Sequence, residues 1–173
     1  MKGAKIMSGK VHSVFGALVG INILIIVNQS EYIALFVPVY IIGALMPDID
    51  MTKSTLGKLL YPISYPISKI FGHRTITHSF LGLIIFNVLL GVMFDSIVKT
   101  QYINSYIIRY THFHFSVGYL THLFSDMLTY QGVPLFYPIK KSFNIAKINS
   151  KKAPDKTITS IITMLIILTL VFR

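Results

Sequence analysis

Five long apolar runs, separated by shorter polar or basic stretches, divide the chain. They cover residues 11–27, 32–46, 78–98, 103–130 and 158–172. A helix needs about 20 residues to cross a bilayer, with a range of about 17 to 25, so the second and fifth runs would borrow flanking residues or thin the bilayer. The pattern predicts an all-α, polytopic helical bundle with about five transmembrane helices. Four crossings plus a re-entrant piece fit the same pattern.

The polar stretches between these runs differ in character. Residues 53–69 mix lysine with leucine and tyrosine and are interrupted by Pro62 and Pro66. This mixture is typical of a kinked segment that lies on lipid headgroups between the second and third helices. The loop 131–156 carries six lysines and is also expected at the membrane surface. Without an internal repeat or a low-complexity stretch, residues 1–173 are interpreted as a single integral membrane domain.

Composition supports a membrane protein. Hydrophobic residues make up 53% of the chain and charged residues 13%, against about 25% charged residues in a soluble domain. The absence of cysteine excludes disulfides and thiolate metal sites, so any metal must bind through histidine, carboxylate or water. Lys2, Lys5 and Lys10 ahead of an apolar run resemble a signal peptide, but no small-x-small cleavage site follows. We therefore expect an uncleaved first helix.

The basic residues predict lipid partners and an orientation. A net charge of +10 could indicate nucleic-acid binding, but the lysines and arginines lie in loops between apolar runs, where they would contact anionic headgroups. We expect no nucleic-acid partner, and the oligomeric state stays open. Thirteen of the 16 basic residues lie in the N-terminal tail, the stretch 47–77 and the loop 131–156, which share one side in a five-helix topology. The positive-inside rule makes that side cytoplasmic.

Polar residues that could carry chemistry stand at the ends of the predicted helices. They are His12, Asp48, Asp50, His73, Arg74, His78, His122 and Asp126. Odd-numbered helices begin, and even-numbered helices end, on the cytoplasmic side. All of these residues should therefore lie at one face of the membrane and at similar depth, where they could form one site.

Spacing adds detail to this expectation. His122 and Asp126 are one helical turn apart and share a face, and ionisable residues inside apolar helices are costly and usually functional. A structural hydrogen bond between helices is the alternative. In an extended segment Asp48 and Asp50 would point the same way and repel unless a cation or a proton intervenes. A solvated turn is the plainer reading of that pair.

The stretch around His73, Arg74 and His78 precedes the third helix. If Thr75 or Thr77 caps this helix, His73 lies on the loop and His78 in the first turn, and both can converge on one point. Arg74 is suited to clamp a phosphate or carboxylate, although it could simply anchor the chain at the headgroups. His12 alone would be an interfacial residue. His112 and His114 lie deeper, where we expect hydrogen bonds between helices.

Histidine and carboxylate ligands suit Zn²⁺ or Mn²⁺, and also iron, better than Mg²⁺. The candidate ligands are His12, Asp48, Asp50, His73, His78, His122 and Asp126. A catalytic zinc takes about three protein ligands, so some of these residues support others or the site holds two or more ions. A bound metal would lower the pKa of a water ligand toward about 7. Arg74, Asp50 and Asp126 are the candidate catalytic residues.

The motifs together resemble a known family. They are His12 with Gly16, Pro47–Asp50, His73–Ser79, Gly118–Thr129 and Tyr137-Pro138. This pattern is similar to that of the YdjM-like group of prokaryotic membrane-bound metal-dependent hydrolases, and it spans residues 12–138. Thr75 stands where a glycine often follows the His-Arg pair. The resemblance implies an inner-membrane, metal-dependent hydrolase but no particular substrate.

Our hypothesis is a hydrolase that cleaves an ester, favouring a phosphoester of a lipid, at the cytoplasmic face. The alternatives are a membrane protein that binds or transports a divalent metal without catalysis, and a protein whose helices a metal holds together. A transport path needs polar residues through the full depth of the bilayer, and Asn22, Asn87, His112 and His114 are too few for one.

Overall fold

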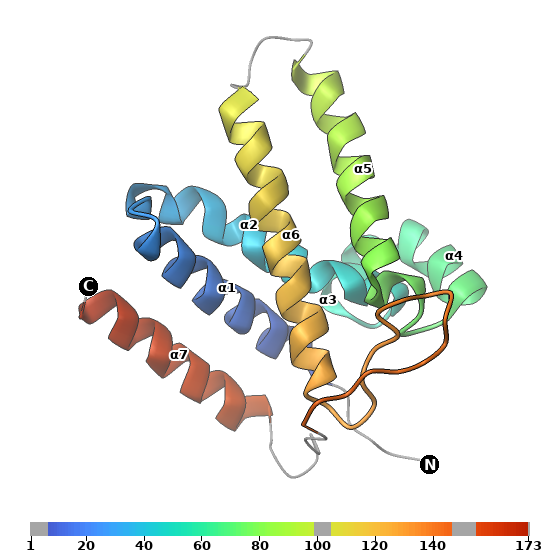
Figure 1. Ribbon diagram of the computed structural model, residues 1–173. Helices are drawn as coiled ribbons and strands as arrows, with labels where there is room; N and C mark the ends of the chain where they lie inside the picture. Colours follow the sequence, from blue (N-terminus) through green and yellow to red (C-terminus); the bar gives the residue numbers. More distant parts are fainter. Residues whose placement is uncertain (1–6, 99–104, 147–154, 173) are drawn as a thin grey trace.

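A computed structural model describes residues 7–98, 105–146 and 155–172, which fold into helices (Figure 1). The long helices are α1 (Gly9–Ile26), α2 (Ile33–Leu45), α5 (Phe80–Val98), α6 (Ser105–Met127) and α7 (Asp155–Val171). Across these described ranges the only β-type pairing is an isolated bridge between Val133 and Phe143 in the loop after α6. The prediction of an all-α fold is therefore confirmed, and each long helix matches one of the five apolar runs.

Short helical segments connect the long ones. They are η1 (Ser30–Tyr32), η2 (Met46–Asp50), α3 (Thr55–Leu59), α4 (Tyr61–Phe71) and η3 (Ile76–His78). The predicted headgroup segment forms α3 and α4, and Pro62 stands in the first turn of α4, where its missing N–H is not needed. Pro47 likewise stands at the start of η2, after Met46, and Asp48 and Asp50 lie in this 3₁₀ turn. The expectation of an extended segment there is wrong.

Helix α2 is the centre of the bundle and packs against both α1 and α6. Glycines permit the closest approaches. A Cβ on Gly43 would lie 2.3 Å from the Phe115 carbonyl oxygen, and one on Gly118 would lie 2.2 Å from the Tyr40 carbonyl oxygen. Small residues at such positions let helix backbones touch, which is how membrane helices pack without a hydrophobic driving force. The backbones of α2 and α6 are therefore held in contact.

Outward-facing apolar side chains fit a lipid surrounding. Val88 on α5 is 60% exposed and Met164 on α7 is 62% exposed, and α7 has no buried residue. Among the described residues, Gly9–Ile26 and Ser30–Asp50 are long and apolar enough to cross a membrane, and Phe80–Asp95 is a shorter apolar helix. These features support a polytopic membrane fold. The count of five crossings stays a prediction.

The helix ends that carry the predicted site residues meet in space. In Figure 1 the first turns of α1 and α5 lie beside the last turns of α2 and α6, with α3 and α4 next to them. The short segments η2 and η3 contact each other at this junction. Lys2, Lys5, Lys147, Lys151 and Lys152, which contribute to the predicted basic side, lie outside the described residues.

Candidate metal centre

Two histidines from α1 and α6 have ring orientations that are set by hydrogen bonds. His122 Nδ1 lies 2.7 Å from the Ala44 carbonyl oxygen, which can only accept, so Nδ1 carries the proton. His12 Nδ1 lies 2.8 Å from Ser125 Oγ, and that hydroxyl donates its own proton to the His122 carbonyl. Ser125 Oγ therefore accepts from His12. In both rings the lone pair is left on Nε2.

His78, at the end of η3, is held in the same way by a carboxylate. Its Nδ1 lies 3.2 Å from Asp50 Oδ2, which leaves Nε2 facing the cluster. Burial disfavours the charged imidazolium, but the Asp50 hydrogen bond and the neighbouring carboxylates outweigh burial and raise the pKa of His78 above its usual value. A histidine whose far nitrogen donates to a carboxylate is the usual arrangement of a metal ligand.

The free nitrogens and two carboxylates converge. His78 Nε2 and His122 Nε2 are 3.2 Å apart, and Asp126 Oδ2 lies 3.7 Å from each of them. Asp48 Oδ1 lies 3.8 Å from His78 Nε2 and 3.9 Å from His122 Nε2. His12 Nε2 lies 3.7 Å from Asp126 Oδ1, and its ring stacks on His122 with centroids 3.8 Å apart. Five side chains from four separate segments therefore face one point.

These spacings match those around a single metal ion. Ligands bonded at 2.0–2.2 Å in a tetrahedron lie about 3.4 Å from one another. The pairs of donor atoms given above are 3.2 to 3.9 Å apart. Two sets of donors lie within 4.8 Å of one another: His12, Asp48 and His122, and His78, His122 and Asp126. Two imidazole lone pairs at 3.2 Å repel each other unless a proton or a cation lies between them. Within the described residues, His12 Nε2 and Asp126 Oδ1 have no hydrogen-bond partner despite full burial. The donor set therefore fits a divalent cation.

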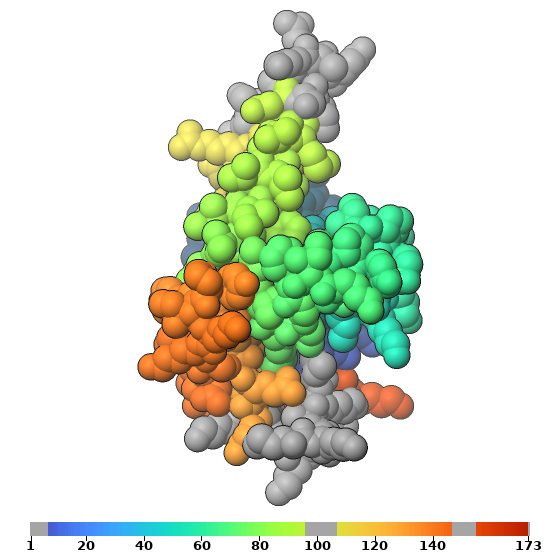
Figure 2. Space-filling view, turned by 90° about the vertical axis from the view of Figure 1, so that its right-hand side faces the viewer, coloured from blue at the N-terminus to red at the C-terminus, as the bar shows by residue number. Residues whose placement is uncertain are grey.

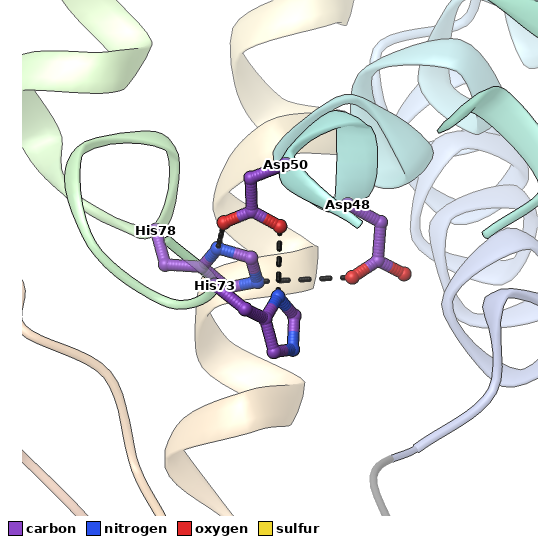
Figure 3. Close-up of side chains that lie close together, drawn as sticks. All are labelled: Asp48, Asp50, His73 and His78. Carbon is purple, nitrogen blue, oxygen red and sulfur yellow. Dashed lines mark hydrogen bonds and ion pairs between the residues drawn. The ribbon is translucent and has the colours of Figure 1, made fainter. Parts of the chain in front are cut away.

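Asp50 supports this cluster, because both of its oxygens are occupied. Oδ1 lies 2.8 Å from His73 Nδ1, and Oδ2 lies 3.2 Å from His78 Nδ1 (Figure 3). Oδ2 also accepts from Thr77 Oγ1 at 2.6 Å and from the Arg74 backbone N–H at 3.0 Å. Asp48, Asp50, His73 and His78 also form a group in which each residue offers one ligand atom within 4.8 Å of the others. In the observed arrangement Asp50 orients the two histidines.

Arg74 links the cluster to the surface. Its Nη2 lies 2.7 Å from Asp126 Oδ2, while Nη1 donates to the exposed Gln131 Oε1 at 2.9 Å. The Arg74 backbone has φ of 59°, a strained conformation for a residue with a side chain, and this turn aims its N–H at Asp50. Thr75 has φ of −121°, so the position after the His-Arg pair does not require glycine here. Arg74 Nε is buried and unpartnered among the described residues.

Burial defines the open side of the site. His12, Asp48, Asp50, His78, His122 and Asp126 are each at most 2% exposed. The His73 side chain is 26% exposed and that of Arg74 is 9% exposed. These two residues are therefore the members of the cluster that reach the surface. The structure brings all eight predicted residues together, with His73 and Arg74 at the rim.

Several supporting groups escape prediction from the sequence. Ser125 and the Ala44 carbonyl fix two of the histidines, and Thr77 binds Asp50 where we expected a helix cap. Instead, Ser79 Oγ accepts from the Gly82 N–H at the start of α5. Ser125 has a recognisable signal, since it lies three residues after His122 and next to Asp126. The Ala44 carbonyl has no such signal, because every residue carries a backbone carbonyl.

The deeper histidines bond between helices, as predicted. His114 Nδ1 lies 2.8 Å from the Tyr40 hydroxyl, which joins α6 to α2. His112 Nδ1 lies 3.3 Å from Asn87 Oδ1, which joins α6 to α5. Neither residue belongs to the cluster.

Comparison with known proteins gives a family match over most of the chain. The family model described as "YdjM inner membrane protein" matches residues 7–173. The Inner membrane protein YdjM of Escherichia coli (strain K12) is 38% identical over 109 residues, which are 63% of this chain and 52% of that protein, and its Shigella flexneri counterpart gives the same values. The protein YvsG of Bacillus subtilis (strain 168) is 31% identical over 97 residues, 56% of this chain and 53% of that protein. The chain spans about half the length of these curated relatives. No solved structure gives a significant match.

Proposed function

The chain belongs to the YdjM inner membrane protein family, and on that premise we propose that it is an inner-membrane, metal-dependent hydrolase that cleaves a phosphoester of a lipid-like substrate. The observation that carries the proposal is the convergence of three imidazole Nε2 atoms and two carboxylates on one buried point. A purely structural polar cluster would satisfy its own donors and acceptors. This one leaves His12 Nε2 and Asp126 Oδ1 buried without a hydrogen-bond partner among the described residues.

Five residues would hold the ion: His12, His78, His122, Asp48 and Asp126. With neutral imidazoles, the three buried carboxylates outweigh the single Arg74 guanidinium by two negative charges, which one divalent cation balances. The mixed nitrogen and oxygen donors favour Zn²⁺ or Mn²⁺. When bound, such an ion acidifies a water ligand and polarises an ester oxygen. The ligands would be oriented by their hydrogen-bonded neighbours Asp50, His73, Thr77 and Ser125.

Arg74 would bind the anionic group of the substrate. Its guanidinium lies at the rim, with a buried, unpartnered Nε and an Nη2 that contacts Asp126. A planar guanidinium pairs with two phosphoryl oxygens at once and stabilises the charge that builds up on them during hydrolysis. Asp126 Oδ1, which has no hydrogen-bond partner among the described residues, would accept the proton of the attacking water. As the water oxygen bonds to phosphorus, the bond from phosphorus to the ester oxygen would break, and the leaving oxygen would take up the proton that Asp126 had accepted.

Hydrolysis is tested on purified protein loaded with Zn²⁺ or Mn²⁺ and offered chromogenic phosphomonoesters, phosphodiesters and carboxylic esters. We expect phosphoester cleavage that a chelator abolishes and that the Arg74→Lys variant weakens chiefly through a higher KM, because lysine cannot pair bidentately. Arg109→Lys is the matched control, since Arg109 is an exposed arginine on α6 away from the cluster. Tight metal binding without cleavage of any ester would instead support a non-catalytic metal-binding protein.

We also propose that the site faces the cytoplasm. Exposed lysines gather at the helix ends that carry the cluster, including Lys53, Lys58, Lys69 and Lys140. Because the chain has no cysteine, single-cysteine variants report the side directly. In intact spheroplasts a membrane-impermeant maleimide should label Glu31→Cys, in the exposed turn between α1 and α2, but should label Lys140→Cys only after lysis. The reverse pattern would overturn this orientation.

A further inference from the structure

Two segments beside the metal centre expose apolar side chains together with lysines. One is α4, and the other is the loop of residues 136–145. We call this pair of segments the interfacial platform. Its exposed apolar residues are Tyr61, Ile63, Tyr65, Ile70, Phe71, Phe136, Ile139 and Ile145, with exposed fractions from 40% to 72%.

Helix α4 presents its apolar side chains outward. Ser64 is fully buried, whereas Tyr61 and Tyr65, one turn apart, are 52% and 47% exposed, and Ile70 is 72% exposed. The amphipathic helix of a water-soluble protein has the opposite arrangement. With 11 residues, α4 is about 17 Å long, roughly half the hydrocarbon thickness, so it can lie on a bilayer but cannot cross it.

The loop is fastened to the start of α5. The Phe80 N–H donates to the Leu135 carbonyl at 2.9 Å, and the Phe80 ring lies 5.5 Å from that of Phe136. Phe136 is nevertheless 53% exposed, and Ile139 is 63% exposed. The loop thus extends the apolar surface of α5 sideways. Figure 2 shows α4 on one side of the first turns of α5 and this loop on the other.

Lysines lie in or beside both segments, and their positive charge favours an anionic partner. Lys69 lies with Nζ 5.8 Å from the centre of the Tyr65 ring, and Lys141 lies 5.7 Å from that of Phe143. Exposed Lys140 adds to them, as does exposed Lys58 on the neighbouring α3, while the platform contains no aspartate or glutamate. Amphipathic lysines above aromatic rings are typical of the boundary between acyl chains and headgroups.

We propose that the interfacial platform lies in the headgroup region of an anionic leaflet, on the same side of the membrane as the metal centre. Helix α4 joins the site through η2, which carries Asp48 and Asp50, and the loop follows Gln131, which accepts from Arg74. The platform would therefore hold the rim formed by His73 and Arg74 at headgroup depth. This inference stands on the exposed surface alone, so it can hold even where the protein hydrolyses no ester.

The protein lacks tryptophan, which makes the depth of single positions measurable. Tyr65→Trp and Phe136→Trp are reconstituted in phosphatidylglycerol-rich vesicles, with Val88→Trp, exposed midway along α5, as the deep reference. We expect both platform tryptophans to be quenched more by lipids brominated near the headgroup than by lipids brominated near the acyl terminus, with little quenching by aqueous iodide. The Val88→Trp protein should show the opposite bromine preference.

Iodide quenching without bromine quenching would place the platform in water and overturn the proposal. Resistance to both quenchers would mean that protein covers the surface, for example in a second copy of the chain, and would overturn it equally. The role of charge is tested by adding Lys69→Glu and Lys140→Glu to the Tyr65→Trp protein. Bromine quenching should fall and iodide quenching should rise in phosphatidylglycerol vesicles, and this change should shrink in neutral phosphatidylcholine vesicles. An equal response in both lipids would remove anionic lipid as the partner.

Discussion

Replacing His122 by alanine should remove the metal while the fold persists. His122 Nε2 faces His78 Nε2 and two carboxylates, so the variant loses a direct ligand. His114 provides a matched control, because it lies two turns earlier on the same helix. Both rings are at most 1% exposed, and both are held by a hydrogen bond from Nδ1 to a group on α2. The two alanine variants therefore lose similar packing, but only one loses a donor to the cluster.

The magnitude follows from the position of the lost atom. Removing a group that only orients a metal ligand typically costs 10–100-fold in metal affinity. The His122→Ala variant deletes the donor atom itself, so we expect a loss of at least about 100-fold, or about 3 kcal/mol. The His114→Ala variant should bind metal within about 3-fold of the parent, since no cluster atom changes.

The assay is a competition titration of metal-free protein against a chromophoric zinc chelator, with metal content measured after gel filtration. Thermal unfolding of the metal-free proteins supplies the stability comparison, in which the two variants should be lowered by similar amounts. Unchanged metal affinity in His122→Ala would refute the assignment of the cluster. Equal loss in both variants would also refute it, because the effect would then come from the general loosening of α6.

Three further outcomes are expected. Ser125→Ala removes the acceptor that orients His12, so metal affinity should fall about 10–100-fold with little loss of fold, as the same titration will show. Gly118→Ala should lower the thermal midpoint or prevent folding, because its Cβ would lie 2.2 Å from the Tyr40 carbonyl oxygen, whereas Gly91→Ala, whose nearest neighbour would be at 3.8 Å, should be tolerated. A free metal concentration about 1,000 times Kd should stabilise the protein by about 4 kcal/mol, and a chelator should reverse this in calorimetry.

The helices and the place of the site are visible in the sequence because both follow from the bilayer. An apolar run long enough to span must be helical, and its polar residues concentrate at its ends. That reasoning placed His12, His78 and Asp126 near one another from three separate stretches, and the structure brings them together. The number of membrane crossings cannot be predicted from the sequence equally well, since apolar runs of intermediate length fit spanning and non-spanning helices alike.

The roles of individual residues depend on contacts that no local pattern records. Asp48 and Asp50 looked equivalent in the sequence. In the structure, a 3₁₀ turn with Pro47 in its first turn places Asp48 at the cluster and Asp50 against His73, His78 and Thr77. The tautomer of His122 depends on a backbone carbonyl of α2. Which nitrogen is free to bind a metal is thus decided by tertiary packing, and spacing along the chain cannot reveal it.

The packing of α6 also argues against conduction of the ion across the membrane. Positions 114, 118, 122 and 126 follow one face of this helix, so a polar path from Asp126 into the bilayer would run along them. At Gly118 this face touches the backbone of α2 so closely that even a methyl group would lie 2.2 Å from a carbonyl oxygen. Beyond that contact, His114 packs against Phe36, with ring centroids 4.0 Å apart. A hydrated ion cannot pass along this face between surfaces in van der Waals contact, whereas the His73 and Arg74 side chains, which are 26% and 9% exposed, reach the surface on the side of the cluster away from Gly118 and His114.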